Sequence, residues 1–162
     1  MRFLTMTRFY ILTAALALFS LAMPSFAGES LLSASLITIK SAHNVATTAD
    51  RLENILKSKG MNVFARIDHA AGAKKADMEL RPTELVIFGN PKVGTPLMRC
   101  SQTMGIDLPQ KALIWEDEKG DVWLGYNDQD DLAKRHSITG CDEVLTKVKG
   151  ALAKFAAAAT SE

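Results

Sequence analysis

Cysteine and histidine are scarce in this sequence, and their spacing excludes several chemistries. The 162 residues contain two cysteines and three histidines. No C-x-x-C pair occurs, which leaves a thioredoxin-like redox role without support. Neither H-x-H nor H-E-x-x-H occurs, and these are spacings that zinc sites use. We therefore expect no metal site and no cofactor.

Long apolar runs are also lacking, apart from one near the start. Arg2 and Arg8 precede the run from Tyr10 to Met23, and a small-x-small ending closes at Ala27. This pattern is typical of a cleaved secretory signal peptide, here residues 1–27, with cleavage after Ala27. The run is shorter than the roughly 20 apolar residues that span a bilayer. We expect a periplasmic or secreted protein with no stable membrane insertion after cleavage.

Charge of one sign is not in excess either. The chain has 19 basic and 18 acidic residues, and the leader removes two arginines, so 19 − 2 = 17 basic residues remain against 18 acidic ones. No basic stripe appears, which argues against nucleic acid and against an anionic membrane surface. The 162 − 27 = 135 remaining residues suit one domain. We expect a flexible tail at 28–35, the domain at 36–157 and a frayed C-terminus at 158–162.

The two cysteines, Cys100 and Cys141, both fall in the expected mature chain. Export would bring them into oxidising surroundings, where a disulfide can form and persist. Spacing alone does not decide the geometry that a disulfide needs, so two separate buried thiols remain the alternative.

Hydrophobic spacing predicts alternating strands and helices. Thr47 is the expected N-cap of the first helix, and the apolar stripe with Val148 and Leu152 predicts a closing helix that lies on a sheet. The predicted order is a strand at 36–40, a helix ending at Gly60, a strand from 61, a strand at 83–90, a short helix from Thr95, a hairpin at 111–128 and the closing helix. This order predicts an α+β domain with two layers and a mostly antiparallel sheet.

The stretch GNPKVG, from Gly89 to Gly94, has the outline of a phosphate-binding loop. Thr95 and Pro96 stand where the motif needs Lys and then Ser or Thr, which argues against a nucleotide. We interpret the stretch as a loop in which Asn90 bonds to the backbone and Thr95 caps the helix that follows.

The segment KALIWEDEKGDVWLGYND reads as a hairpin with Lys119 and Gly120 as a two-residue turn. That turn predicts Trp115 opposite Leu124. It leaves a half-polar outer face formed by Ile114, Glu116 and Trp123.

Three longer runs resemble one known family. They are FARIDHAAGA (64–73), ELRPTELVIFGNPKVGTPLM (79–98) and GIDLPQKALIWEDEKGDVWLGYND (105–128). Together they resemble the bacterial domain-of-unknown-function family 302 over about residues 41–157. The resemblance implies a compact β-α-β(4)-α fold similar to that of the TATA-binding protein. It implies no activity, and neither cysteine belongs to the family pattern.

Polar residues at predicted strand ends are the candidate site. We expect some of these ends to converge on one rim of the sheet, beside the glycine stretch. The leading hypothesis is a non-catalytic module that binds a small anionic or amphipathic ligand there. Arg81 would orient the ligand, and His69 and Asn90 would donate hydrogen bonds. The candidate ligand-binding residues are Arg81, His69, Asn90, Thr95 and Tyr126.

Two other functions stay open at this point. One is a hydrolase-like enzyme with His69 as general base and Asp68 or Glu116 as the orienting acid. The other is a module that binds a protein partner through the face with Ile114 and Trp123. A structural role is the alternative for Arg81 and His69, and the sequence leaves the oligomeric state open.

Overall fold

The structure is a computed structural model, and it describes residues 35–162. The expected signal peptide at 1–27 and all but the last residue of the expected tail at 28–35 lie outside the described residues.

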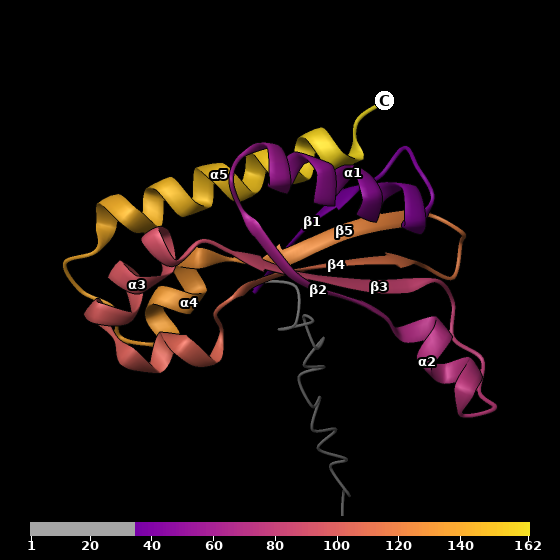
Figure 1. Ribbon diagram of the computed structural model, residues 1–162, viewed down its shortest axis with the longest axis horizontal. Coiled ribbons are helices and arrows are strands. Elements are labelled where there is room, and N and C mark those ends of the chain that lie inside the picture. Colours follow the sequence, from indigo (N-terminus) through magenta and orange to yellow (C-terminus); the bar gives the residue numbers. More distant parts are fainter. Residues whose placement is uncertain (1–34) are drawn as a thin grey trace, which may run out of the picture.

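Five strands form one antiparallel sheet. They are β1 (Leu36–Lys40), β2 (Asn62–Asp68), β3 (Thr83–Gly89), β4 (Gln110–Glu116) and β5 (Val122–Asn127). The order across the sheet is β1-β5-β4-β3-β2, so β4 is central and β1 and β2 are the edges (Figure 1). The predicted α+β class with an antiparallel sheet is confirmed.

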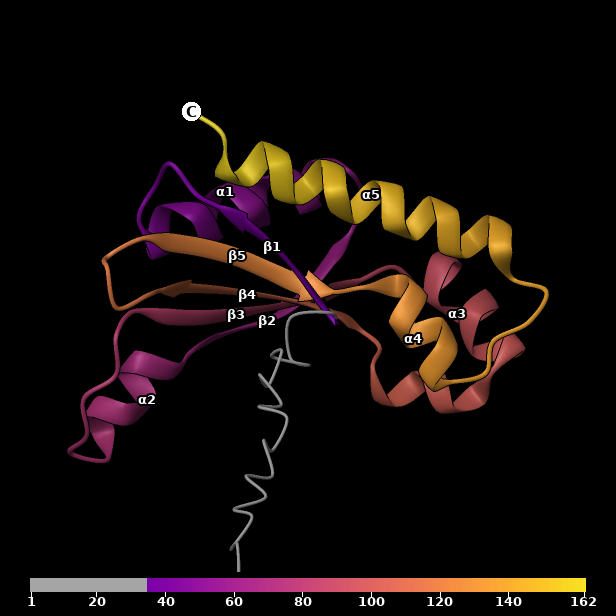
Figure 2. The same ribbon diagram turned by 180° about the vertical axis from the view of Figure 1, so that it is seen from behind.

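Within residues 35–162, five helices and one 3₁₀ turn lie over one face of the sheet and at its ends. They are α1 (Val45–Ser58), α2 (His69–Lys75), α3 (Pro91–Cys100), η1 (Gln102–Ile106), α4 (Gln129–Arg135) and α5 (Asp142–Thr160). Helices α1 and α5 lie side by side over one face of the sheet, as both views show (Figures 1 and 2). No helix within residues 35–162 combines the length and the apolar character needed to cross a bilayer.

The sheet has two contrasting ends. At the packed end, where β3 and β5 finish and β4 begins, α3, η1 and α4 gather into a small lobe (Figure 1). At the arm end, α2 and the segment up to Pro82 project from the body as an arm (Figure 2). Antiparallel pairing creates this division, because successive strands finish at opposite ends.

The core lies between the sheet and the pair α1 and α5. Helix α1 buries Ala49, Leu52 and Leu56 at helical spacing, and α5 buries Val148 and Leu152 as the stripe predicts. Burial of each large side chain contributes about 1.5–3 kcal/mol. The sheet supplies the opposing side chains, among them Val86, Phe88, Ala112, Ile114, Val122, Leu124 and Tyr126.

Helix α1 begins earlier than the sequence predicts. Asn44 is its N-cap, and the side-chain oxygen of Asn44 accepts a hydrogen bond from the Thr47 backbone N–H at 2.8 Å. Thr47, the expected cap, is therefore in the first turn. Asparagine ranks above threonine as an N-cap, which accounts for the earlier start.

Helix α3 also begins earlier, and this changes the meaning of the GNPKVG stretch. Asn90 is the N-cap, with its side-chain oxygen 2.9 Å from the Lys92 backbone nitrogen, and Pro91 takes the first helical position. Proline suits that position because its missing N–H would be unpaired there anyway. The interpretation of the stretch as a loop capped by Thr95 is wrong, since Thr95 lies inside α3.

The hairpin between β4 and β5 differs by one residue from the predicted register. Trp115 lies opposite Trp123, and Ile114 lies opposite Leu124. The turn has three residues rather than two, with Gly120 in the left-handed region at φ 80°. The shift moves the side chains of β4 to the opposite face, whereas those of β5 keep their expected faces. The predicted outer face is therefore wrong for Ile114, which is fully buried in the core, and right for Trp123.

Asp117 holds this turn together. Its carboxylate accepts hydrogen bonds from the backbone N–H groups of Lys119 and Asp121 and from the Trp123 indole N–H at 2.8 Å. The indole hydrogen bond, followed by the two backbone ones, lowers the pKa of Asp117 below its ordinary value.

The C-terminal end of α5 is clasped rather than frayed. Arg51 donates to the carbonyl groups of Ala158, Ala159 and Ser161, and the Ala42 N–H donates to the carbonyl of Thr160. Helix α5 runs to Thr160, whose side chain is buried. The prediction of fraying from residue 158 is wrong, because these donors satisfy the last carbonyl groups of the helix.

A disulfide joins Cys100, at the end of α3, to Cys141, just before α5. The 41-residue separation means that this bond closes a long loop across the packed end. Of the two alternatives that the sequence left open, the structure has the bonded one.

Candidate functional site

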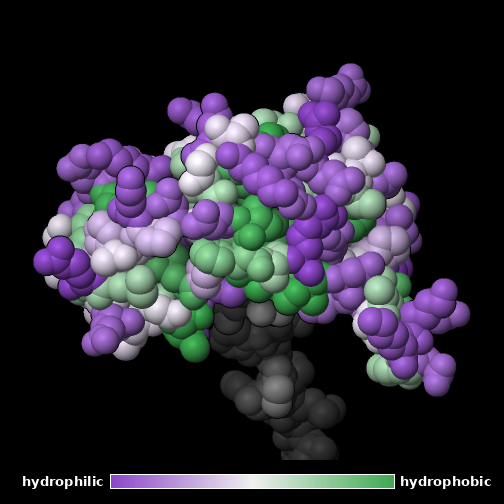
Figure 3. All heavy atoms as spheres, in the orientation of Figure 1, coloured by the Kyte–Doolittle hydropathy of each residue, from purple (hydrophilic) through white to green (hydrophobic). Residues whose placement is uncertain are grey.

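An apolar groove opens at the packed end, between α3 and α5. Its cavity measures about 420 Å³. Helix α3 contributes Val93 and Met98 to one wall, and α5 contributes Leu152 and Phe155 to the other. Figure 3 shows apolar surface in the middle of this face, with hydrophilic surface on both sides of it. The remaining apolar lining residues are Met61, Phe64, Phe88, Pro91, Leu97, Leu108, Pro109, Val148 and Ala151.

Phe64 lies at this groove because of an irregularity in β2. The pairing of β2 with β3 shifts register between Val63 and Ala65, and Phe64 is the residue between them. Such bulges redirect a side chain from its regular place. Phe64 is 55% exposed as a residue even though it lines an apolar cavity.

Gly89, at the end of β3, lies beside Phe64 and Pro109 in the lining of the groove. A β-carbon added there would lie 3.5 Å from the Phe64 ring and 3.4 Å from the β-carbon of Pro109. Both distances are ordinary van der Waals contacts, so a small side chain at position 89 would fit beside Phe64 and Pro109.

Lysine is the charged residue type around the groove. Lys147 lines it, and Lys59, Lys147 and Lys154 line the shallow hollow that adjoins it along α5. Within residues 35–162, no carboxylate lines either the groove or this hollow. The exposed pair Lys147 and Glu143, at 2.6 Å, lies along α5, and this hydrogen bond lowers the pKa of Glu143.

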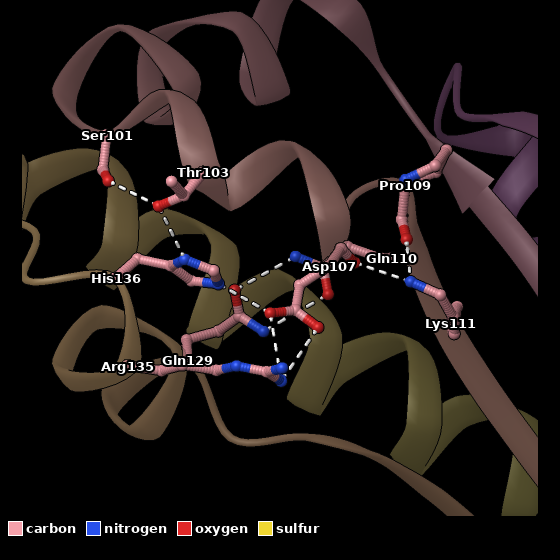
Figure 4. Close-up of polar contacts among 9 residues, drawn as sticks. All are labelled: Ser101, Thr103, Asp107, Pro109, Gln110, Lys111, Gln129, Arg135 and His136. Carbon is pink, nitrogen blue, oxygen red and sulfur yellow. Dashed lines mark hydrogen bonds and ion pairs between the residues drawn. The ribbon is translucent and has the colours of Figure 1, made fainter.

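A polar cluster, defined as Ser101, Thr103, Asp107, Arg135 and His136, occupies the lobe itself (Figure 4). The buried His136 ring places Nε2 2.6 Å from an Asp107 carboxylate oxygen and Nδ1 3.0 Å from the Thr103 hydroxyl. A carboxylate only accepts hydrogen bonds, so Nε2 carries a proton and donates it to Asp107. In that tautomer, Nδ1 accepts a hydrogen bond from the Thr103 hydroxyl group.

The cluster continues at both of its ends. The Thr103 hydroxyl lies 3.1 Å from that of Ser101, and Arg135 lies 3.3 Å from the Asp107 carboxylate. This chain of hydroxyl, imidazole and carboxylate groups can relay a proton. Its contacts also join the segment after α3 to the segment after α4, so the cluster holds the lobe together.

A pair of buried glutamines lies beside the cluster (Figure 4). Gln110 and Gln129 exchange side-chain hydrogen bonds of 3.0 and 3.3 Å, and Gln129 also donates to the carbonyl of Asn127. Buried amides need such partners, because an unpaired one costs about 1–3 kcal/mol. The pair therefore fixes α4 against the start of β4.

The structure does not bring the predicted site residues together. Asp68 and Glu84 are paired at the arm end, and His69 follows Asp68, whereas Asn62 and Gly89 are paired at the packed end next to Asn90. The expectation that strand ends converge beside Asn90 is therefore wrong. The reason is that β2 and β3 are antiparallel, so β2 ends at the arm end and β3 ends at the packed end.

Most predicted residues at the arm end have local structural contacts. Asp68 caps α2 by accepting from the Ala71 N–H at 2.8 Å, and the exposed His69 begins that helix. Arg81, 53% exposed in its side chain, donates to the carbonyl of Glu116 at 3.2 Å and lies 3.9 Å from the Glu118 carboxylate.

Three predicted residues lie at the packed end. Asn90 and Thr95 line the groove, and the Asn90 side chain also donates to the carbonyl of Gly60. Tyr126 is buried in the core, and this burial raises the pKa of its hydroxyl. Among the residues that the structure describes, no group of three or more His, Cys, Asp or Glu side chains is placed to hold a metal ion.

Sequence reasoning missed Phe64, Lys147 and the pair of Asp107 and His136. The groove draws its lining from segments far apart in the chain, and no local spacing marks such a surface. Asp107 belongs to the DLP run inside one of the family-like stretches, and the sequence indicates no partner for its carboxylate.

The fold and these features define a two-layer α+β domain with a five-stranded antiparallel sheet. The family model "Domain of unknown function DUF302" matches residues 37–155, and the chain belongs to this family. A solved structure of an uncharacterized conserved DUF302 protein from Bacillus stearothermophilus is similar, with a TM-score of 0.71 and 17% identity over 78% of this chain and 98% of that one. This likeness supports the fold alone.

Three proteins of Brucella are closer in sequence. The chain is 49% identical over 132 residues to "Fluoride-specific ion channel FluC 1" of Brucella suis biovar 1 (strain 1330), across 79% of this chain and 52% of that protein. The Brucella abortus "Fluoride-specific ion channel FluC 1" and the Brucella melitensis "Fluoride-specific ion channel FluC 2" match at the same identity across 49% of their lengths. The chain spans about half the length of these relatives.

These relatives correct the function predicted from the sequence. The sequence favoured an exported, non-catalytic small-ligand binding module, with a hydrolase-like enzyme or a partner module as alternatives. Proteins that share 49% identity over most of the chain are instead named as fluoride-specific ion channels.

Proposed function

We propose that this chain works together with a fluoride-specific ion channel, as the α+β domain that accompanies the conducting part. The observation that carries the proposal is the 49% identity over 132 residues to proteins named as fluoride-specific channels. The matched region makes up about half of those relatives, and we assign ion conduction to their other half.

The organisation of the domain supports this division of labour. The described residues enclose a core of their own between the sheet and the pair α1 and α5, and a disulfide and buried polar pairs fix the packed end. An independently stable domain can be joined to a channel or can bind to one without contributing to the pore.

Export forms part of the same proposal. A cleaved leader at residues 1–27 would deliver the domain to the outer side of the inner membrane. The disulfide between Cys100 and Cys141 supports this location, because such bonds persist in oxidising compartments.

Fluoride efflux tests the proposed function directly. The conducting half of the Brucella suis relative is reconstituted in liposomes loaded with fluoride, and efflux is followed with a fluoride electrode with and without the exported chain. We expect the chain to bind the channel liposomes and to change the efflux rate. Liposomes with an unrelated channel serve as the control. Equal efflux together with no binding would contradict the proposal.

A growth assay provides an independent test in cells. Bacteria that lack this chain should grow less well in fluoride than cells carrying it. Re-expression of the chain without residues 1–27 should fail to restore growth if the domain works outside the cytoplasm. Equal fluoride tolerance with and without the chain would argue against the proposal.

A further inference from the structure

We infer that the apolar groove between α3 and α5 is the docking site for an apolar segment of the channel that carries a carboxylate at one end. This inference rests on the proposed function, because it names the surface by which the domain would meet its channel.

The composition of the groove fits a peptide segment. A cavity of about 420 Å³ has room for several side chains. Its walls are aliphatic, aromatic and methionine side chains. Met61, just before β2, and Met98, in α3, line the groove from two separate segments. Methionine side chains adapt their shape to a binding partner. Apolar anchors in such grooves supply most of the binding energy of helix-in-groove complexes.

Phe64 is the strongest indication that something covers this surface. An aromatic side chain that is 55% exposed beside an apolar cavity leaves apolar area in water, which is unfavourable. The bulge in β2 places the Phe64 side chain at the groove, because Phe64 lies outside the regular pairing with β3. Aromatic residues at the mouth of a pocket are typical hot spots of interfaces.

The lysines decide the chemistry of the partner. Lys59, Lys147 and Lys154 line the hollow that continues the groove along α5, and no carboxylate lines either surface within residues 35–162. Glu143 pairs with Lys147, so Lys59 and Lys154 supply the positive charge for a partner. A segment with an acidic end therefore complements the groove, whereas a basic one is repelled. A second copy of this chain would bring its own lysines against these, so the charge disfavours self-association through this face.

Binding to the channel tests the inference. The fluorescently labelled exported chain is titrated onto nanodiscs that contain the channel, and the dissociation constant is measured. Phe64→Glu should weaken binding at least tenfold. The matched control is Leu80→Glu, which places the same charge on a residue that is 50% exposed at the opposite end of the sheet. It should change binding less than twofold.

Charge reversal provides a second readout. Lys154→Glu should weaken binding several-fold at low salt, and the difference should shrink at high salt because salt screens exposed charges. Circular dichroism and thermal melts check that each variant is folded. If Phe64→Glu does not fold, Phe64→Ser takes its place, with Leu80→Ser as its control.

The outcomes separate the groove from the proposed function. If the wild-type chain binds and Phe64→Glu binds equally well, the groove is not the docking site, and the proposed function stands. If the wild-type chain does not bind the channel, both the docking site and the proposed function are wrong. Equal binding to empty nanodiscs would indicate a lipid occupant and would overturn the inference. A dimer that Phe64→Glu dissociates would indicate a second copy and would overturn it as well.

Discussion

The two ends of the sheet differ in how the chain is held. The packed end has the disulfide between Cys100 and Cys141, the buried contact of His136 with Asp107 and the apolar groove. At the arm end, α2 contains no buried residue, and Met78 and Leu80 are 61% and 50% exposed. The disulfide, the buried polar contacts and the candidate interface therefore lie together at one end, and the arm is little buried.

Removal of the disulfide should have the largest effect. In the chain-entropy treatment, a loop closed across 41 residues contributes about 4 kcal/mol. The double variant Cys100→Ser, Cys141→Ser should therefore lower the free energy of unfolding by about that amount in urea titrations. The wild-type chain with reductant is the control and should behave in the same way. An unchanged unfolding midpoint would mean that the packed end does not depend on this bond.

Loss of His136 should come second. His136→Ala removes the donor to the Asp107 carboxylate, whose side chain is only 12% exposed, and should cost about 2–3 kcal/mol. A double-mutant cycle with Asp107→Asn, measured by urea unfolding, isolates the contact. The double variant should lose less than the sum of the two single losses. Strict additivity would show that the two side chains do not interact.

The hairpin turn at the arm end should respond to pH. The pKa of Asp117 is lowered by its hydrogen bonds, chiefly from Trp123, so its stabilising effect is present above the unfolded-state pKa and is lost as pH falls through the lower folded-state value. Asp117→Asn should therefore reduce the melting temperature at neutral pH. The gap from wild type should close in strongly acidic solution. Melting curves across pH test this, and a gap that persists unchanged would refute it.

Substitutions in the arm should have the smallest effects. A β-carbon at Gly72, inside α2, would meet no atom within 4 Å, so Gly72→Ala should stabilise the protein by about 0.5–1 kcal/mol through helix propensity. Leu80→Ser should stay within about 0.5 kcal/mol of wild type. Thermal melts measure both. A large loss from either change would show that the arm is packed against something, which would end the contrast between the two ends.

Periodic patterns predicted the fold well. Leu52 and Leu56 in α1, and Val148 and Leu152 in α5, follow helical spacing, and the structure buries all four. Such patterns work because one face of each element must be covered by another element.

Turns and the site were harder to predict. One extra residue in the turn at Gly120 exchanged the two faces of β4, and the Asn90 cap turned an expected loop into helix α3. These outcomes depend on small differences in cap and turn preference. The groove could not be predicted, because Phe64 in β2 and Phe155 in α5 line one cavity only when the helix layer packs on the sheet.

The hydrogen bonds from Arg51 to the end of α5 determine how the chain can be truncated or tagged. A carboxypeptidase should digest residue 162 readily and then slow at the last helical turn, where the guanidinium group binds three carbonyl oxygens. A truncation after residue 157 would remove that turn and leave the guanidinium group without these acceptors. A tag placed after residue 162 with a short spacer would preserve them.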